Sequence, residues 1–101
     1  MQDYIEKNGG ATIKNNSIIE YKRGYQIAVN SSEKMFNTFK DLQDYIKEQS
    51  LTCVGVWIYN NQYCMDTNTM HINNKAQAIA LAKEHKQKAI WDWYNKKEIF
   101  V

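Results

Sequence analysis

The sequence predicts an α+β fold: a largely antiparallel sheet with two helices packed on one face, in the order ββαββαββ. Three patterns lead to this prediction. Residues 52–67 place β-branched and aromatic side chains on both sides of Asn60-Asn61, as a β-hairpin does. Residues 39–49 have apolar side chains at helical spacing, and residues 74–87 are rich in alanine, so each range predicts a helix. The strands are joined by short turns, which favours antiparallel pairing.

The N-terminal residues, 1–16, contain Asn8-Gly9-Gly10 and few large apolar side chains, so we expect a flexible arm there. Residues 17–101 are expected to form a single domain, because a chain of 101 residues buries enough surface for one core. Residues 17–22 and 24–30 are strand-like, and a turn at Arg23-Gly24 would join them. A polar loop is expected at 30–34.

The two helices are predicted from their caps as well as from their periodicity. Thr38 can cap the first helix, with Asp41 at the third helical position. Asn74 can cap the second helix after a loop at 68–73, with Gln77 three residues on. Residues 88–94 and 98–101 then form a terminal hairpin, whose turn at Asn95-Lys96 would place Phe100 opposite Trp91.

The register of the central hairpin determines which side chains share a face. A two-residue turn at Asn60-Asn61 pairs Tyr59 with Gln62. The face that belongs to the core is then Val54, Val56, Ile58, Tyr63 and Met65. The opposite face combines aromatic and polar residues: Cys53, Gly55, Trp57, Tyr59, Gln62, Cys64 and Asp66. This second face is unusual for a strand surface in water, so we expect more of the chain, or a partner, to cover it.

Composition excludes several classes of protein. The formal net charge is +2, and the basic residues form no continuous block of the kind that nucleic-acid-binding tails have. Two cysteines do not make a disulfide framework, and the expected register holds Cys53 and Cys64 too far apart to bridge. We find no apolar run of membrane-spanning length and no signal-peptide pattern, so a cytoplasmic protein with reduced thiols is expected.

The sequence gives little support for catalysis, and we expect neither an enzyme nor a cofactor. The candidate soft metal ligands are Cys53, Cys64, His71 and His85, and their spacing matches no structural zinc motif, so no metal site is expected. A nucleophilic thiol arrangement of Cys64, His71 and Asp66 is an alternative, because a thiol needs a base to ionise it and a third group to orient that base. No neighbouring turn or helix start would activate this thiol.

The aromatic residues favour a protein-binding function. Tyrosine and tryptophan carry much of the binding energy at protein interfaces, because each combines a large apolar body with a polar tip. The residues expected to contact a partner are Trp57, Tyr59, Trp93, Lys96 and Lys97. The competing interpretation is that tryptophans such as Trp57 and Trp91 fill the core. A homodimer that buries the aromatic face stays open.

A nucleic-acid-binding function is a second alternative. Bases would stack on the aromatic sheet face, flanked by a set of basic residues. That set is Lys22, Arg23, Lys88, Lys96 and Lys97. A chain with a single arginine is poorly equipped for base or phosphate recognition, so this alternative ranks below protein binding.

One stretch also resembles proteins of a known kind. Val54-Gly-Val-Trp-Ile58, followed by a hairpin and by Ala78-Ile-Ala-Leu-Ala-Lys-Glu-His-Lys-Gln-Lys-Ala-Ile-Trp-Asp92, resembles small accessory proteins of Gram-positive phages and integrative elements. Some of these proteins are anti-defence factors, including inhibitors of CRISPR effectors. The resemblance implies a compact, non-enzymatic protein that binds a protein or nucleoprotein of the bacterial host cell. It assigns no functional residue.

Overall fold

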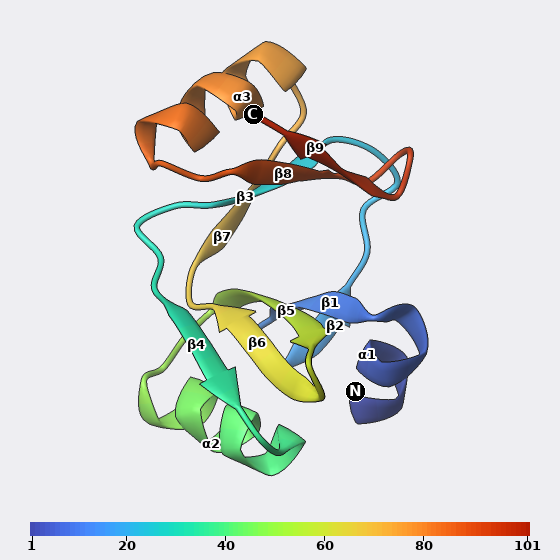
Figure 1. Ribbon diagram of the computed structural model, residues 1–101, viewed down its shortest axis with the longest axis vertical. Coiled ribbons are helices and arrows are strands. Elements are labelled where there is room, and N and C mark those ends of the chain that lie inside the picture. The colour runs from blue at the N-terminus through green and yellow to red at the C-terminus, as the bar shows by residue number, and fades with distance from the viewer. The chain divides into compact units, whose positions relative to one another are not determined.

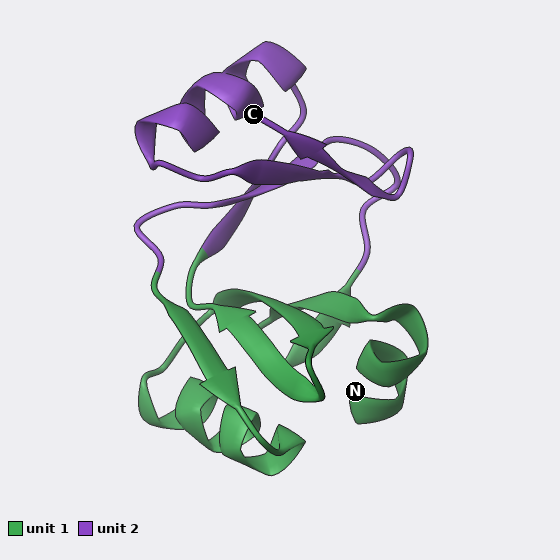
Figure 2. Ribbon diagram, in the orientation of Figure 1, with its two compact units in different colours: residues 1–19, 32–68 green, residues 20–31, 69–101 purple.

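The computed structural model describes all residues, 1–101, and the chain divides into two compact units (Figures 1 and 2). Unit 1 comprises residues 1–19 and 32–68, and unit 2 comprises residues 20–31 and 69–101. Each unit has its own sheet and its own hydrophobic core, where we expected one domain over 17–101. The α+β class and the antiparallel pairing are confirmed, whereas the structure has three helices and two sheets.

Unit 1 is a five-stranded sheet with two helices on one face (Figure 1). The helices are α1 (Gln2–Asn8) and α2 (Phe39–Glu48). The strands are β1 (Gly10–Lys14), β2 (Ser17–Ile19), β4 (Glu33–Phe36), β5 (Cys53–Tyr59) and β6 (Gln62–Asp66), in the spatial order β2-β1-β5-β6-β4. Helix and sheet side chains meet in one core: Ile5, Ile13, Phe39, Leu42, Ile46, Val54, Val56, Tyr63 and Met65.

The segment 1–16 is not a flexible arm in the structure. It forms α1 and β1, and β1 lies inside the sheet between β2 and β5. Ile5 and Ile13 are 0% and 2% exposed. The apolar residues of this segment are few, but strand pairing places Ile13 opposite Val54 and brings both into the core. Burial of these two isoleucines stabilises the segment by several kcal/mol, on the order of 2 for each fully buried side chain.

The central hairpin has the predicted register. Asn60 and Asn61 have φ angles of 51° and 60°, and Tyr59 pairs with Gln62. Asparagine suits this turn because its short polar side chain tolerates left-handed backbone. The predicted core face is confirmed, with Ile58 packed at its edge. The same turn chemistry joins β1 to β2, where Asn15 and Asn16 have φ angles of 50° and 65°.

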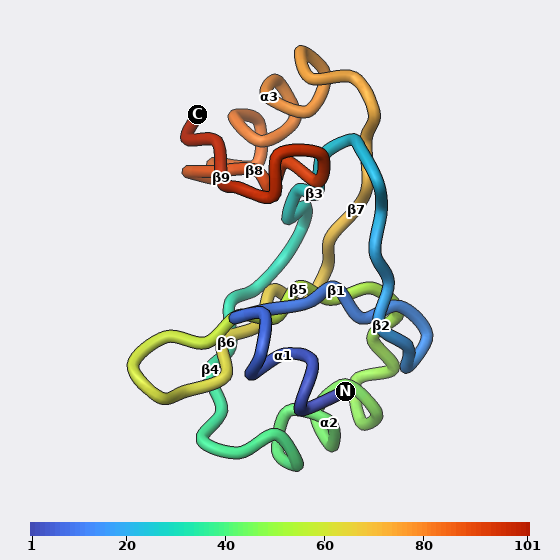
Figure 3. Tube along the Cα trace, turned by 90° about the vertical axis from the view of Figure 1, so that its right-hand side faces the viewer, coloured from blue at the N-terminus to red at the C-terminus, as the bar shows by residue number.

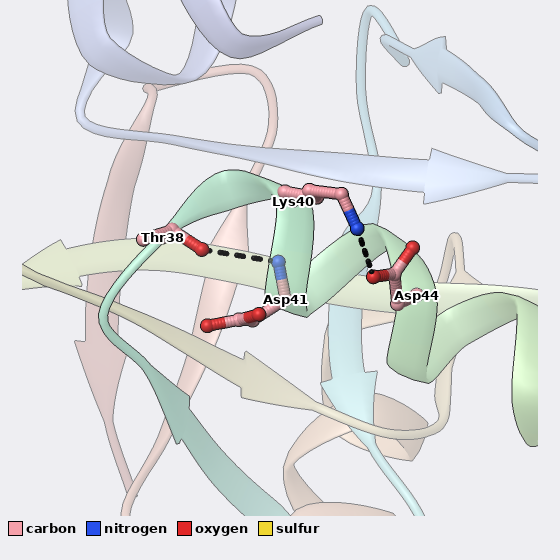
Figure 4. Close-up of polar contacts among 4 residues, drawn as sticks. All are labelled: Thr38, Lys40, Asp41 and Asp44. Atoms are coloured by element: carbon pink, nitrogen blue, oxygen red, sulfur yellow. Dashed lines mark hydrogen bonds and ion pairs between the residues drawn. The ribbon is translucent and has the colours of Figure 1, made fainter.

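Helix α2 begins as predicted (Figure 4). The Thr38 hydroxyl oxygen accepts a hydrogen bond from the backbone N–H of Asp41 at 3.2 Å. One turn on, the Lys40 ammonium lies 2.8 Å from the Asp44 carboxylate, an exposed i, i+4 pair that contributes little to stability. The helix packs Phe39, Leu42 and Ile46 on the sheet.

Unit 2 is a four-stranded sheet with one helix on one face (Figures 1 and 3). Its strands are β3 (Tyr25–Ala28), β7 (Thr69–Ile72), β8 (Ala89–Asp92) and β9 (Lys97–Phe100), in the order β7-β3-β8-β9. Helix α3 (Lys75–Glu84) begins at the predicted cap, where the Asn74 side chain accepts from Gln77 N–H at 3.0 Å. Ala78 and Ala82 are fully buried, and their small side chains let α3 lie close against Ile27 and Ile90.

Several expected connections differ in the structure. Strands β2 and β3 do not form a hairpin, because β2 pairs with β1 in unit 1 and β3 pairs with β7 and β8 in unit 2. The expected loops at 30–34 and 68–73 contain the start of β4 and the strand β7. Both strands lie at sheet edges, where one neighbour is enough and polar residues are tolerated.

The terminal hairpin has a longer turn than predicted. Residues 93–96 connect β8 to β9, and Asp92 pairs with Lys97. Trp91 therefore faces Glu98, whereas Phe100 pairs with Ala89. A shift of two residues keeps every side chain on its expected face, because side chains alternate along a strand with a period of two.

The left-handed turn at Asn60-Asn61 gives a first prediction. Asn61→Val should lower the free energy of unfolding by about 1–2 kcal/mol, because a β-branched residue is strained at positive φ. Urea denaturation followed by tryptophan fluorescence measures the change. Asn61→Gly, which tolerates this φ, is the matched control and should be at least as stable as the parent chain. Equal losses in both variants would contradict the assigned turn.

Candidate functional site

The candidate site lies where three connections of unit 2 meet at one end of its sheet. These are residues 20–24 before β3, residues 73–74 after β7 and residues 93–96 after β8. The register brings them together, because Tyr25 pairs with both Ile72 and Asp92. We call this region the loop end of unit 2. It holds a pocket of about 460 Å³ lined by Arg23, Gly24, Tyr25, Asn73, Asp92, Tyr94 and Asn95.

The backbone beside the pocket is held at two consecutive carbonyls. His71 Nε2 lies 2.8 Å from the Arg23 carbonyl oxygen, and Trp93 N–H donates to the Gly24 carbonyl at 3.0 Å. Gly24 has a φ of 89°, and a Cβ there would overlap the His71 ring, so glycine is required. The His71 ring stacks on Tyr21 with centroids 3.7 Å apart. These contacts fix the position from which the Arg23 side chain leaves the backbone.

Asp92 organises the turn on the other side of the pocket. Its carboxylate accepts hydrogen bonds from Tyr94 N–H at 3.0 Å, Asn95 N–H at 3.2 Å and Asn95 Nδ2 at 2.8 Å. The Asn95 side chain is the main cause that lowers the pKa of Asp92, with the two backbone donors and the charge of Lys97 adding to it against burial. Asp92 is therefore an ionised structural group that holds Tyr94 and Asn95 in place.

An aromatic cluster supports the same loops. Trp93 lies edge-on to both Tyr21 and Trp91, with ring centroids 5.6 and 6.3 Å apart. Its indole N–H donates to Gln26 Oε1 at 3.2 Å, and Gln26 donates onward to Thr69 Oγ1 at 3.0 Å. Trp93, a predicted contact residue, thus has its polar atom engaged within unit 2. Through its backbone N–H, which donates to the Gly24 carbonyl, Trp93 supports the wall of the pocket.

Charge is distributed unevenly between the two units. Unit 2 contains eight Lys or Arg and four Asp or Glu, a formal charge of +4, whereas unit 1 contains five and seven, which gives −2. Four exposed cations lie in the loop end of unit 2 or, for the last of them, at the start of β9 directly after it: Lys22, Arg23, Lys96 and Lys97. The Arg23 guanidinium forms no hydrogen bond or ion pair within the chain. The loop end is therefore basic, and its Arg23 guanidinium is available to bind a ligand.

The structure assigns the five predicted contact residues to different units. Trp57 and Tyr59 share one face of β5 in unit 1, and Tyr59 is 62% exposed. Trp93, Lys96 and Lys97 come together in unit 2, at the turn after β8. Sequence reasoning missed Asn73, Tyr94 and Asn95. The aspartate three residues before Asn95 was the available signal, because an aspartate at the start of a turn accepts hydrogen bonds from the residues that follow.

The geometry does not support a nucleophilic thiol site made of Cys64, His71 and Asp66. Cys64 is 1% exposed, and burial is the main cause that raises the pKa of its thiol, with the charge of Glu33 adding to it. A nucleophilic thiol needs the opposite shift. Cys64 and Asp66 lie in unit 1, whereas His71 lies in unit 2 with its ring on Tyr21. No group of three His, Cys, Asp or Glu side chains is arranged to hold a metal ion.

Alkylation measures the state of this thiol. At neutral pH, iodoacetamide should label Cys64 at least about tenfold more slowly than free cysteine, because the thiol is buried and its thiolate is disfavoured. Peptide mapping by mass spectrometry separates Cys64 from the half-buried Cys53, and labelling in urea is the control that restores reactivity. Labelling of Cys64 as fast as free cysteine would revive the thiol alternative.

A second electrostatic feature lies on the sheet face of unit 1 that is opposite α1 and α2. Asp66 on β6 pairs with Glu33 on β4. Burial, and then the negative charge of Glu33, raise the pKa of Asp66 to about 6. The folded state therefore resists ionisation of this carboxyl, while the unfolded chain ionises near the ordinary aspartate value.

The raised pKa predicts a loss of stability with rising pH. The penalty is absent below the unfolded pKa of 3.8, grows as pH rises toward 6 and is complete above it. Asp66→Asn should raise the free energy of unfolding by about 1 kcal/mol at about pH 7.5, after allowance for solvent screening, and by much less near pH 4. Urea denaturation at both pH values checks this. A gain of the same size at the two pH values would show that charge is not the cause.

Comparisons with known proteins do not identify a relative: no family model, no curated protein and no solved structure matches the chain. None of the three helices has the length and apolar character needed to cross a membrane.

Proposed function

We propose that the chain is a non-enzymatic protein-binding module, encoded by a phage or mobile element, that inhibits a bacterial defence system such as a CRISPR effector by direct contact in the cytoplasm. The resemblance of residues 54–93 to such accessory proteins supports the class of role. The observation that carries the binding proposal is the basic loop end of unit 2, with its pocket and its exposed aromatic residue Tyr94, which is 76% exposed.

The contact residues follow from this placement. Lys96 and Lys97 provide charge at the turn, and Tyr94 and Arg23 provide the types of side chain that dominate interface energetics. Trp93 ties the turn to β3 through its hydrogen bond to Gln26. Tyr59 is a further exposed aromatic residue, on unit 1. A net charge of +4 on unit 2 favours an acidic surface on the partner, because complementary charge speeds association and rejects basic surfaces.

Nucleic-acid binding is the second candidate, and one observation favours it. Four of the five basic residues named from the sequence lie in the loops at this end of unit 2 or directly after them: Lys22, Arg23, Lys96 and Lys97. The fifth, Lys88, precedes β8 at the other end of that strand. Phosphate contacts would give an affinity that falls steeply with salt concentration. Protein binding through a mixed aromatic and basic surface depends on salt less strongly.

Charge reversal at the turn tests the protein-binding proposal. The tagged full chain should retain a specific partner from nuclease-treated bacterial lysate, and the Lys96→Glu/Lys97→Glu variant should lose at least about tenfold of it, because repulsion then opposes an acidic surface. Quantitative mass spectrometry of the retained proteins is the measurement.

The matched control reverses two exposed lysines elsewhere in unit 2. Lys83→Glu/Lys86→Glu changes the net charge equally, but these residues lie at the far end of α3, and retention should stay within about twofold of the parent chain. Equal loss in both variants would show non-specific charge attraction. Retention that disappears on nuclease treatment would favour the nucleic-acid candidate instead.

A further inference from the structure

We infer that the pocket at the loop end of unit 2 receives a carboxylate side chain from an acidic peptide segment of the partner, with Arg23 as its anchor. This inference rests on the proposed protein-binding function and specifies its chemistry. A volume of about 460 Å³ accommodates one acidic side chain together with part of its neighbours, and lies within the usual range for binding pockets.

Arg23 is prepared for this role by the chain around it. Its carbonyl contacts His71 and the next carbonyl accepts from Trp93, so the backbone is held while the guanidinium stays uncommitted. A guanidinium is planar and presents parallel N–H donors that match the two oxygens of a carboxylate. Binding therefore costs little backbone ordering and gains a charge-assisted bidentate contact.

Neutral donors complete the pocket wall. Asn73 and Tyr94 line the pocket, and neither the Asn73 side-chain amide nor the Tyr94 hydroxyl has a hydrogen-bond partner in the chain. Asn95 is different, because its Nδ2 already donates to Asp92. A carboxylate that bridges Arg23 and one of these free donors would have both of its oxygens satisfied, as desolvation of a charged group requires.

The charges around the pocket favour a carboxylate over a nucleic acid. The cations Lys22, Arg23, Lys96 and Lys97 still outnumber the carboxylates Glu20, Asp92 and Glu98 at this end of the unit. Asp92 remains an anion in the pocket wall, but its oxygens are already occupied by three donors from Tyr94 and Asn95. One monoanion next to Arg23 fits this arrangement. A polyphosphate backbone would bring a charge for each nucleotide and needs a continuous basic track, whereas Arg23 is the one cation that lines the pocket.

Fluorescence anisotropy with defined probes tests the inference on the full chain. A fluorescein-labelled hexaglutamate peptide should bind at about 50 mM salt, and the uncharged hexaglutamine peptide should not. Arg23→Lys should weaken hexaglutamate binding by about tenfold, because it keeps the charge and loses the planar fork. Lys88→Ala, at the other end of β8, is the control for general charge and should stay within about twofold.

Three outcomes would overturn the inference. These are equal binding of the glutamine peptide, no effect of Arg23→Lys, or tighter Arg23-dependent binding of a labelled oligothymidylate. Partner capture separates this failure from failure of the proposed function. Capture that is lost in Lys96→Glu/Lys97→Glu but kept in Arg23→Lys preserves the function and refutes the pocket. Peptide binding that depends on Arg23, with no partner captured from lysate, would support the pocket and refute the proposed function.

Discussion

The alternation of side chains along a β-strand is the constraint on which both units depend. Helices seal one face of each sheet, so every second residue of a strand enters a core and the residues between them must face away. In unit 1 this sorting gives Val54 and Val56 to the core and leaves Trp57 and Asp66 on the other face. In unit 2 it gives Ile90 to the core and Trp91 to the other face. The sheet faces that lack helices therefore carry Trp57, Asp66 and Trp91.

The parts of the fold that could be predicted are those with local causes. Asn60-Asn61 sets a hairpin within a few residues, and Thr38 and Asn74 cap helices that begin at the next position. The division into two units has only part of its cause in the local sequence. The Asn15-Asn16 turn pairs β2 with β1, but nothing between Ile19 and Tyr25 indicates that β3 joins another sheet, because the partners of β3 lie far along the chain. The prediction of a flexible arm at 1–16 was wrong for the same reason, because Ile13 is brought into the core by pairing with Val54, far along the chain.

The sequence was enough to pick out the charged and aromatic residues of the candidate site, but not to predict which loops come together to form its pocket. Lys96, Lys97 and Trp93 were singled out because their residue types suit binding, and they do lie together. Arg23 and Asn73 lie 50 positions apart in the sequence, and only the pairing of β3 with β7 and β8 brings both to one pocket. The structural role of Asp92 was not predicted, because its carboxylate meets its donors on Tyr94 and Asn95 only when residues 93–96 form the turn.

The interleaved composition of unit 2 has a consequence for synthesis of the chain. Strand β3 leaves the ribosome early, while β7 and β8, which flank it, are translated only after residue 68. Unit 1 has all of its residues by then and can fold first. Between those moments Ile27 and Val29 are an apolar segment with open hydrogen-bonding edges, the kind of nascent stretch that chaperones bind. A premature stop between residues 69 and 88 would leave that segment permanently without β8.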